Sequence, residues 1–217
     1  MALKVSDIIT NARRLLQDTD SGGIRWVDNE LIGWLNEGSA EIGRIHPESS
    51  ARNTDVALLT GTKQTIPSDG TQLLDVIRNV GPLGEPGRVV RIVDRRVMDN
   101  ERPDWHFDSP SADVKRYIFN ENDPLTFYVY PPNTGAGKLT IVYAAAPERV
   151  VELNDPLPIR DIYFAAACNY ICYRAWQKQI DDQEAQGKSI LFKQLFDQAM
   201  GERRMIEGEA SPNARVR

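Results

Sequence analysis

Hydrophobic residues recur at helical spacing near both ends of the chain, whereas the middle of the chain carries short apolar runs separated by turns. Residues 6–17, 28–45, 159–180 and a fourth stretch that ends near residue 206 show the helical period. Asp28 precedes the second apolar stripe, and its carboxylate is suited to accept the free amide hydrogens of a first helical turn. The pattern therefore predicts four helices, two from each end of the chain.

The apolar stripes of these helices predict a shared core. Gly38 lies on the stripe of the second helix, where a partner helix could pass closely. The 159–180 segment has apolar residues on most of its sides, so we expect burial in its own bundle or against a neighbouring subunit. The predicted core residues are Leu15, Trp26, Leu31, Trp34, Leu35, Ile42, Tyr163, Tyr170, Trp176 and Leu195.

The middle of the chain, roughly residues 53–151, is typical of short β-strands. Apolar residues 125, 127 and 129 alternate with polar or aromatic neighbours, which is the period of a half-buried strand. Residues 95–113 are less regular, and they predict a short helical turn near 96–99 and a loop that carries Trp105. Strands are predicted at 56–59, 65–66, 73–77, 89–93, 114–120, 125–130 and 138–144.

These elements predict an α+β fold in which a four-helix bundle is built from both chain ends. An antiparallel β-rich domain is inserted into the bundle, because short strands this close together favour antiparallel pairing. The predicted domains are residues 1–52 with 157–206 for the discontinuous bundle, 53–156 for the insert and 207–217 for an extended C-terminal tail. The tail is polar, so alone it buries too little surface to offset its ordering entropy.

Composition and charge narrow the classes of function. The chain has 217 residues, 41% of them apolar, which is enough for one good core, or for one core and a smaller second one. Its net charge of −5 lacks the basic surplus of proteins that grip nucleic acid, although a mildly acidic wall could let DNA slide past. The sequence contains no apolar run near the roughly 20 residues of a membrane span and no signal peptide. We therefore expect a soluble protein, made in the cytosol, with no membrane partner.

Two motifs could bind a cofactor or a metal ion, and neither is complete. The Gly135-Ala136-Gly137-Lys138 run lacks the earlier glycine and the following hydroxyl residue of a phosphate loop, so a hairpin turn is the better interpretation. Cys168 and Cys172 lie four residues apart, and neither histidine adds a ligand at metal-binding spacing. We predict reduced, buried cysteines and no cofactor.

Two further features leave alternatives open. His106 lies between Trp105 and Phe107 and near two aspartates, so it could act as a general base, although packing is the more common role of such a histidine. The arginines of the stretch 88–102 could form a solvated or salt-bridged face, contact an acidic neighbouring subunit, or contact DNA. A nucleic-acid-binding or hydrolytic protein that uses the Arg88–Arg102 stretch or His106 is therefore the alternative function.

Residues 24–37 resemble the opening of the head-to-tail adaptor proteins of short-tailed bacteriophages, the tail tubular protein A type. The likeness lies in the Arg25-Trp26 pair, the acidic cap Asp28 and the amphipathic helix with Asn36 that follows. That helix ends near a proline, although His46 precedes Pro47 where the family often has arginine. The later segment that ends in Tyr173-Arg174-Ala175-Trp176 also resembles the third helix of that family, whereas the β-rich middle matches only in placement and length.

The resemblance implies a structural protein of the virion rather than an enzyme. It implies a homo-oligomeric ring, typically of twelve subunits, that joins the portal protein to the tail nozzle or tail fibres at the head–tail junction. DNA would pass through the lumen without specific binding. The residues that would reach the portal are Glu207, Glu209, Ser211, Pro212, Asn213, Arg215, Val216 and Arg217. The residues that would contact a neighbouring subunit or the nozzle are Arg88, Arg91, Arg95 and Arg96.

Overall fold

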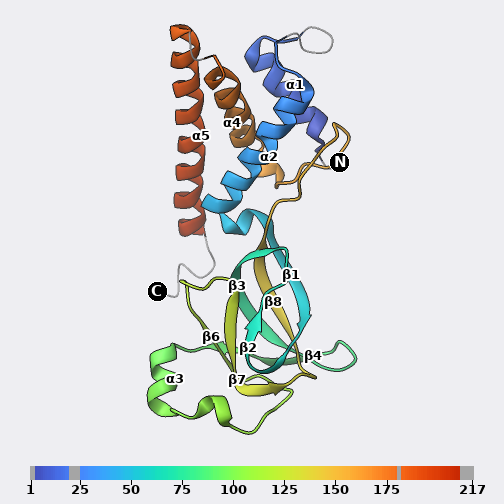
Figure 1. Ribbon diagram of the computed structural model, residues 1–217, viewed down its shortest axis with the longest axis vertical. Helices are drawn as coiled ribbons and strands as arrows, with labels where there is room; N and C mark the ends of the chain where they lie inside the picture. The colour runs from blue at the N-terminus through green and yellow to red at the C-terminus, as the bar shows by residue number, and fades with distance from the viewer. Residues whose placement is uncertain (1–2, 20–24, 180–181, 211–217) are drawn as a thin grey trace. The chain divides into compact units, whose positions relative to one another are not determined.

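The computed structural model describes residues 3–19, 25–179 and 182–210, with the backbone alone for 202–210. The chain divides into two compact units (Figure 1). The helical unit comprises the residues up to Ser49 and those from Pro147 onward, and the β unit comprises Ser50–Ala146. The protein is therefore of the mixed α+β class, as predicted, and both chain ends contribute to one unit.

Four α-helices make up the helical unit, with α4 in contact with each of the other three (Figure 1). Small side chains such as Ala167, Cys168 and Ala175 are buried along α4, which allows its neighbours to approach closely. Gly38 lies at one such approach, because a Cβ there would be 2.9 Å from the Tyr170 ring, and this confirms the predicted close passage. The helices are α1 (Val5–Leu16), α2 (Asp28–Ile45), α4 (Phe164–Gln177) and α5 (Gln183–Ala210).

Two four-stranded sheets form the β unit, in the orders β1-β8-β3-β4 and β2-β7-β6-β5. All pairs are antiparallel except β5 with β6. The strands are β1 (Ala51–Ala57), β2 (Thr60–Thr65), β3 (Gly70–Val80), β4 (Pro86–Val89), β5 (Arg91–Ile92), β6 (Arg116–Phe119), β7 (Thr126–Thr134) and β8 (Lys138–Ala145). Phe127, Val129, Leu139 and Ile141 are fully buried in their shared core.

The strand predicted at 89–93 is in fact two strands that belong to different sheets. The chain leaves the first sheet after Val89 and enters the second at Arg91, and Val90 between them is buried. A parallel β5–β6 pair needs a long crossover. The crossover contains α3 (Arg95–Glu101), which includes the helical turn predicted near 96–99, and the short 3-10 helix Trp105–Phe107.

Asn79 holds this sheet-to-sheet junction together. Its side-chain amide donates to the carbonyl oxygens of Arg88 (2.9 Å) and Val114 (2.7 Å), and its side-chain oxygen accepts the amide of Val114 (2.7 Å). Asn79 is only 2% exposed, so these bonds satisfy a polar group that would otherwise be costly to bury.

Candidate assembly surfaces

The structure buries most of the predicted bundle-core residues in the helical unit. Those buried are Trp26, Leu31, Leu35, Ile42, Tyr163 and Trp176, while Trp34 and Tyr170 are partly buried and pack against them. Leu15 and Leu195 differ from the prediction, with 46% and 39% exposure. Each is adjacent to a buried apolar residue, Leu16 or Phe196, and successive helical residues point about 100° apart. A neighbouring helix therefore covers one member of each pair and leaves the other exposed.

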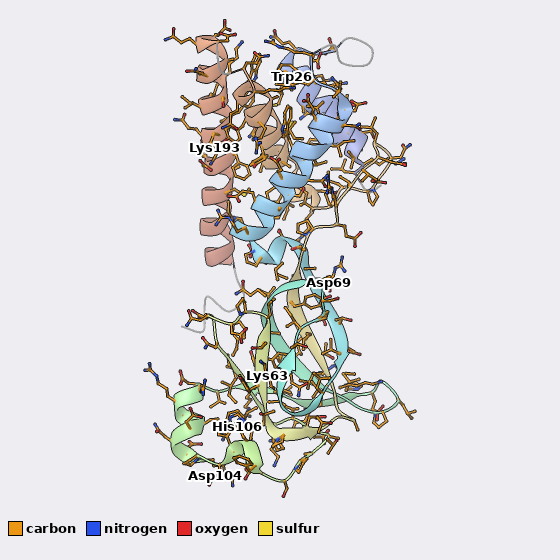
Figure 2. The ribbon with its side chains drawn as sticks, viewed as in Figure 1. Trp26, Lys63, Asp69, Asp104, His106 and Lys193 are labelled. Carbon is orange, nitrogen blue, oxygen red and sulfur yellow. The ribbon has the colours of Figure 1, made fainter. Side chains whose placement is uncertain are left out.

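The Arg25-Trp26 pair joins the start of α2 to the end of α4. Trp26, which is labelled in Figure 2, is 1% exposed, and its indole N–H donates to the carbonyl oxygen of Ala175 (3.3 Å). Its ring meets the Trp176 ring edge-on at 5.5 Å. The Arg25 guanidinium lies 4.9 Å and 5.2 Å from the centres of these two rings, within the range of cation–π attraction.

Arg13 links the end of α1 to the start of α2. Its guanidinium donates to the carboxylates of Asp18 (2.7 Å) and Asp28 (2.6 Å) and to the Trp26 carbonyl oxygen (2.9 Å). Asp28 does not cap α2 as predicted, since it is the first helical residue and Val27 is the cap without a side-chain hydrogen bond. The Asp28 carboxylate is instead bound by Arg13, which is a contact that sequence spacing does not reveal.

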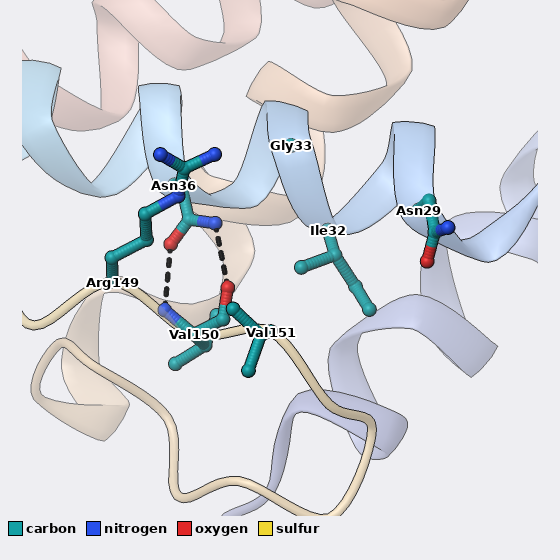
Figure 3. A pocket seen from close by; sticks show the side chains of 7 residues that line it. All are labelled: Asn29, Ile32, Gly33, Asn36, Arg149, Val150 and Val151. Atoms are coloured by element: carbon teal, nitrogen blue, oxygen red, sulfur yellow. Dashed lines mark hydrogen bonds between the residues drawn. The ribbon is translucent and has the colours of Figure 1, made fainter.

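A shallow groove of about 220 Å³ lies between α2 and the segment that follows β8 (Figure 3). The Asn36 amide donates to the Val150 carbonyl oxygen (2.9 Å), and the Val150 N–H donates back to the Asn36 side-chain oxygen (2.9 Å). This double hydrogen bond fixes the segment beside the helix. The groove is lined by Asn29, Ile32, Gly33, Asn36, Arg149, Val150 and Val151.

The structure places the arginines of the stretch 88–102 on several elements at the surface of the β unit. Arg88 lies on β4, Arg91 on β5, and Arg95 and Arg96 on α3, and all four are exposed. Arg95 pairs with Asp99 (3.3 Å), whereas the other three have no ion pair among the described residues. They therefore form a scattered basic surface rather than one stripe.

Arg102 belongs to a salt-bridged cluster instead. Its guanidinium donates to the carboxylate of Asp108 (2.5 Å) and to the Tyr130 hydroxyl (2.6 Å). The Tyr130 hydroxyl also donates to Asp108 (2.9 Å), and this bond, followed by the Arg102 contact, lowers the pKa of the Asp108 carboxyl. The cluster anchors the loop after α3 to β7.

His106 is packed against aromatic rings at the surface. The His106 ring, whose place is labelled in Figure 2, stacks on Trp105 with centres 3.6 Å apart, and a ring nitrogen is 2.8 Å from the Thr62 hydroxyl. Among the described residues, neither Asp104 nor Asp108 forms a hydrogen bond with it. The stacking on Trp105 and the Thr62 contact favour the packing role for His106, and no carboxylate among the described residues is hydrogen-bonded to its ring.

The loop of residues 135–138 is a tight turn that joins β7 to β8, but these strands belong to different sheets and do not pair, so the predicted hairpin is wrong. The buried Asn133 accepts the amides of Gly135 (2.8 Å) and Gly137 (3.2 Å) and donates to the Ala112 carbonyl oxygen (3.0 Å). A Cβ on Gly137 would lie 2.3 Å from the Ala112 oxygen. The amides that a phosphate loop would offer to a ligand are therefore already used within the turn.

The two cysteines are buried free thiols on α4. Contact with Cys168, together with burial, raises the pKa of the Cys172 thiol, so this side chain stays neutral.

The buried His46 contacts the Glu48 carboxylate (2.7 Å) and the Met200 carbonyl oxygen (3.0 Å). In the described part of the chain, no three His, Cys, Asp or Glu side chains gather closely enough to hold a metal ion.

The predicted tail begins later than expected. α5 continues to Ala210, so Glu207 and Glu209 lie in a helix rather than in an extended segment. The apolar pattern of the sequence ends near residue 206, but the next residues include glutamate and alanine, which are good helix formers, so the helix can continue to Ala210. Ser211, Pro212, Asn213, Arg215, Val216 and Arg217 lie outside the described residues. No helix within the described residues combines the length and apolar character of a membrane span.

Comparison with known protein families decides the class of this protein. A family model described as SU10 adaptor protein matches residues 3–217. The chain belongs to the SU10 adaptor protein family. Membership confirms the resemblance to phage head-to-tail adaptors that the Arg25-Trp26 region indicated. A comparison with curated proteins found no significant match. This adaptor is thus a structural component of a phage virion.

Proposed function

We propose that this adaptor forms a ring that joins the portal to the tail nozzle and encloses part of the DNA passage. The observation that carries the proposal is the match of nearly the whole chain, residues 3–217, to a phage adaptor family. By the family resemblance, the ring has twelve copies and lies at the head–tail junction. The net charge of −5 suits a passage wall that repels phosphates instead of binding them.

The two units suggest a division of labour within this ring. In the proposal, α1, α2, α4 and α5 act as one four-helix bundle that packs beside its neighbours and meets the portal. The β unit carries the exposed cations Arg88, Arg91 and Arg96, which would meet an acidic surface of the nozzle or a neighbouring subunit. Residues 207–217 would reach the portal.

Electron microscopy of the protein mixed with portal rings tests the proposal directly. The expected result is a second ring bound to one end of the portal, with rotational averaging giving its copy number. Mixtures in which the portal rings remain bare would refute the portal-to-tail role.

Two truncations test the tail. A chain that ends at residue 210 keeps all of α5, and one that ends at 206 also removes its last turn. Both should remain folded by circular dichroism and lose portal binding in co-sedimentation. A full-length chain with residues 211–217 in scrambled order is the matched control for length and charge. Full portal binding by the chain that ends at 206 would show that the tail does not contact the portal.

A charge-reversal variant tests the basic surface. Replacing Arg88, Arg91 and Arg96 by glutamate should leave portal binding intact and abolish binding of the nozzle or weaken contacts between subunits. A variant with Arg52, Lys63 and Lys138 replaced by glutamate, elsewhere on the β unit, changes the net charge by the same amount and is the control. Equal effects of the two variants would mean that net charge, rather than this surface, determines binding.

A further inference from the structure

One face of α5 carries no charged residue over about four turns. α5 packs against α4, and Ala185, Phe196 and Met200 on its inner side are at most 3% exposed. At about 100° per residue, the opposite face consists of Gly187, Ile190, Leu191, Gln194, Leu195, Gln198 and Gly201. The three aliphatic residues of this outer face are 39% to 60% exposed. The solvent face of a surface helix ordinarily carries charged residues, so an uncharged outer face with exposed leucines indicates contact with another molecule.

The glycines of the outer face point to another backbone. A Cβ on Gly187 or Gly201 would meet no atom within 4 Å, so neither is required by packing within the chain. Glycine inside a helix costs about 0.5–1 kcal/mol relative to alanine, and its usual benefit is close approach of another backbone. The nearby lysines are already paired, Lys188 with Glu184 (2.6 Å) and Lys193 with Asp197 (2.5 Å).

A second line of uncharged residues in the helical unit runs along α2, with Arg149 as the one charged residue in the lining of the groove beside it. Asn29, Gly33, Asn36 and Ala40 follow one line on the helix, and a Cβ on Gly33 would also meet no atom within 4 Å. The groove in Figure 3 lies along part of this line, with the 67%-exposed Val151 on its other side. In Figure 1, α5 lies on the left of the helical unit, whereas the segment after β8 runs on the right.

We propose that the outer face of α5 in one copy docks into the α2 groove of the next copy, with Leu191 seated over Gly33. This inference rests on the proposed ring. A second copy is the fitting occupant because the outer face of α5 and the line along α2 both lack charge, which keeps the desolvation cost low, while the one charged residue of the groove lining, Arg149, is left to an acidic side chain at the margin. Since the two surfaces differ, the contact is heterologous, and rotation can close it into a ring.

Charge at the margin supports the same pairing. Arg149 at the groove is exposed and has no ion pair among the described residues. Glu184, whose side chain is 76% exposed, lies seven residues before Leu191 on the same line of α5. Seven residues span about 10 Å along a helix, so with Leu191 seated over Gly33 the exposed Glu184 carboxylate, which also pairs with Lys188, would lie near a cation at the end of the groove.

Disulfide trapping tests the contact without the portal. Full-length Leu191→Cys and Gly33→Cys chains are mixed under mild oxidation, and cross-linked dimers are counted by mass spectrometry. A disulfide needs Cα atoms within about 7 Å, so the mixed pair should form about tenfold more dimer than the control pair. The control pairs Gly33→Cys with Leu83→Cys, which is 95% exposed on the β unit. The native Cys168 and Cys172 are at most 1% exposed and should not compete.

Two outcomes would overturn the inference. Equal cross-linking of the control pair would mean random collision, and faster self-cross-linking of Leu191→Cys would mean that α5 packs on α5. A ring on the portal without the specific cross-link refutes this contact and leaves the proposed function intact. The specific cross-link without portal binding refutes the proposed function and retains the contact.

Interface-breaking variants give a second, independent readout. Leu191→Glu and Gly33→Gln should each remain folded, because both positions face open space, and each should prevent ring formation. In an equal mixture, the intact outer face of α5 in the Gly33→Gln chain can dock into the intact groove of the Leu191→Glu chain. The remaining two surfaces of that pair are both altered, so assembly should end at dimers. Rings formed by the mixture, or by either variant alone, would contradict the heterologous contact.

Discussion

Replacing Gly38 by alanine should destabilise the helical unit, whereas the same change at Gly33 on the same helix should stabilise it. A Cβ at position 38 would lie 2.9, 3.1 and 3.2 Å from Cδ1, Cγ and Cβ of Tyr170. The clash reaches the root of the Tyr170 side chain, so a rotation of the ring alone cannot relieve it. Overpacking of this kind costs about 1–3 kcal/mol.

The gain in helix propensity acts in the other direction and is common to both variants. Alanine is favoured over glycine by about 1 kcal/mol inside a helix. Gly33→Ala should therefore gain about 1 kcal/mol, because nothing lies within 4 Å of the new methyl group. Gly38→Ala should lose up to about 2 kcal/mol after the two effects are combined.

Urea unfolding followed by tryptophan fluorescence is the appropriate assay, since Trp26, Trp34 and Trp176 all lie in the helical unit. The two variants should differ by about 1–3 kcal/mol in the free energy of unfolding. Equal stabilities would refute the close approach of α2 and α4 at this point. Measurement at low protein concentration keeps contacts between copies out of the comparison.

Three further changes test other contacts. Arg13→Ala should lower the free energy of unfolding in urea by about 2–3 kcal/mol, because it leaves the Asp18 carboxylate, only 6% exposed, without its guanidinium partner. Arg14→Ala on the same helix is the control, and equal losses of stability in the two variants would refute the role of the ion pairs. Asn36→Ala should lower the free energy of unfolding by about 1–3 kcal/mol and speed proteolysis of the segment after β8, since the Val150 amide and carbonyl lose their hydrogen-bond partner. An unchanged rate of proteolysis would contradict the role of this double hydrogen bond in holding the segment. The pKa of Asp108 is lowered in the folded state, so its contribution to stability is present above the ordinary carboxyl range and lost as pH falls through the folded pKa. Wild type should therefore exceed Asp108→Asn in thermal stability at pH 7, and the gap should close in acid; a gap independent of pH would disprove this.

Assembly also bears on why this chain keeps features that weaken a single copy. Exposed Leu191 and Leu195 and the outer-face glycines of α5 stabilise neither unit of the isolated protein. Residues of this kind are retained where another surface covers them. Contact between copies, rather than the fold of one copy, explains them in the proposed ring.

The sequence by itself determined the elements whose signal is local. Helical spacing of apolar residues located α1, α2 and α4, because a helix is formed by hydrogen bonds between residues four apart. The Arg25-Trp26 region also carried the family resemblance, since it is a contiguous motif. The turn at residues 135–138 was predictable for the same reason, whereas the placement of its two strands in different sheets was not.

Tertiary structure decided what depends on residues distant in sequence. The split of one apolar run at Val90 follows from pairing with β3 on one side and β6 on the other, and no local pattern encodes those partners. Which of two adjacent leucines is buried depends on where α4 lies, so Leu15 is exposed and Leu16 is not. The groove along α2 likewise exists only because Asn36 binds Val150, 114 residues away. The spacing of apolar residues predicts that one face of a helix or strand will be buried, and the three-dimensional arrangement of the chain determines which residues cover it.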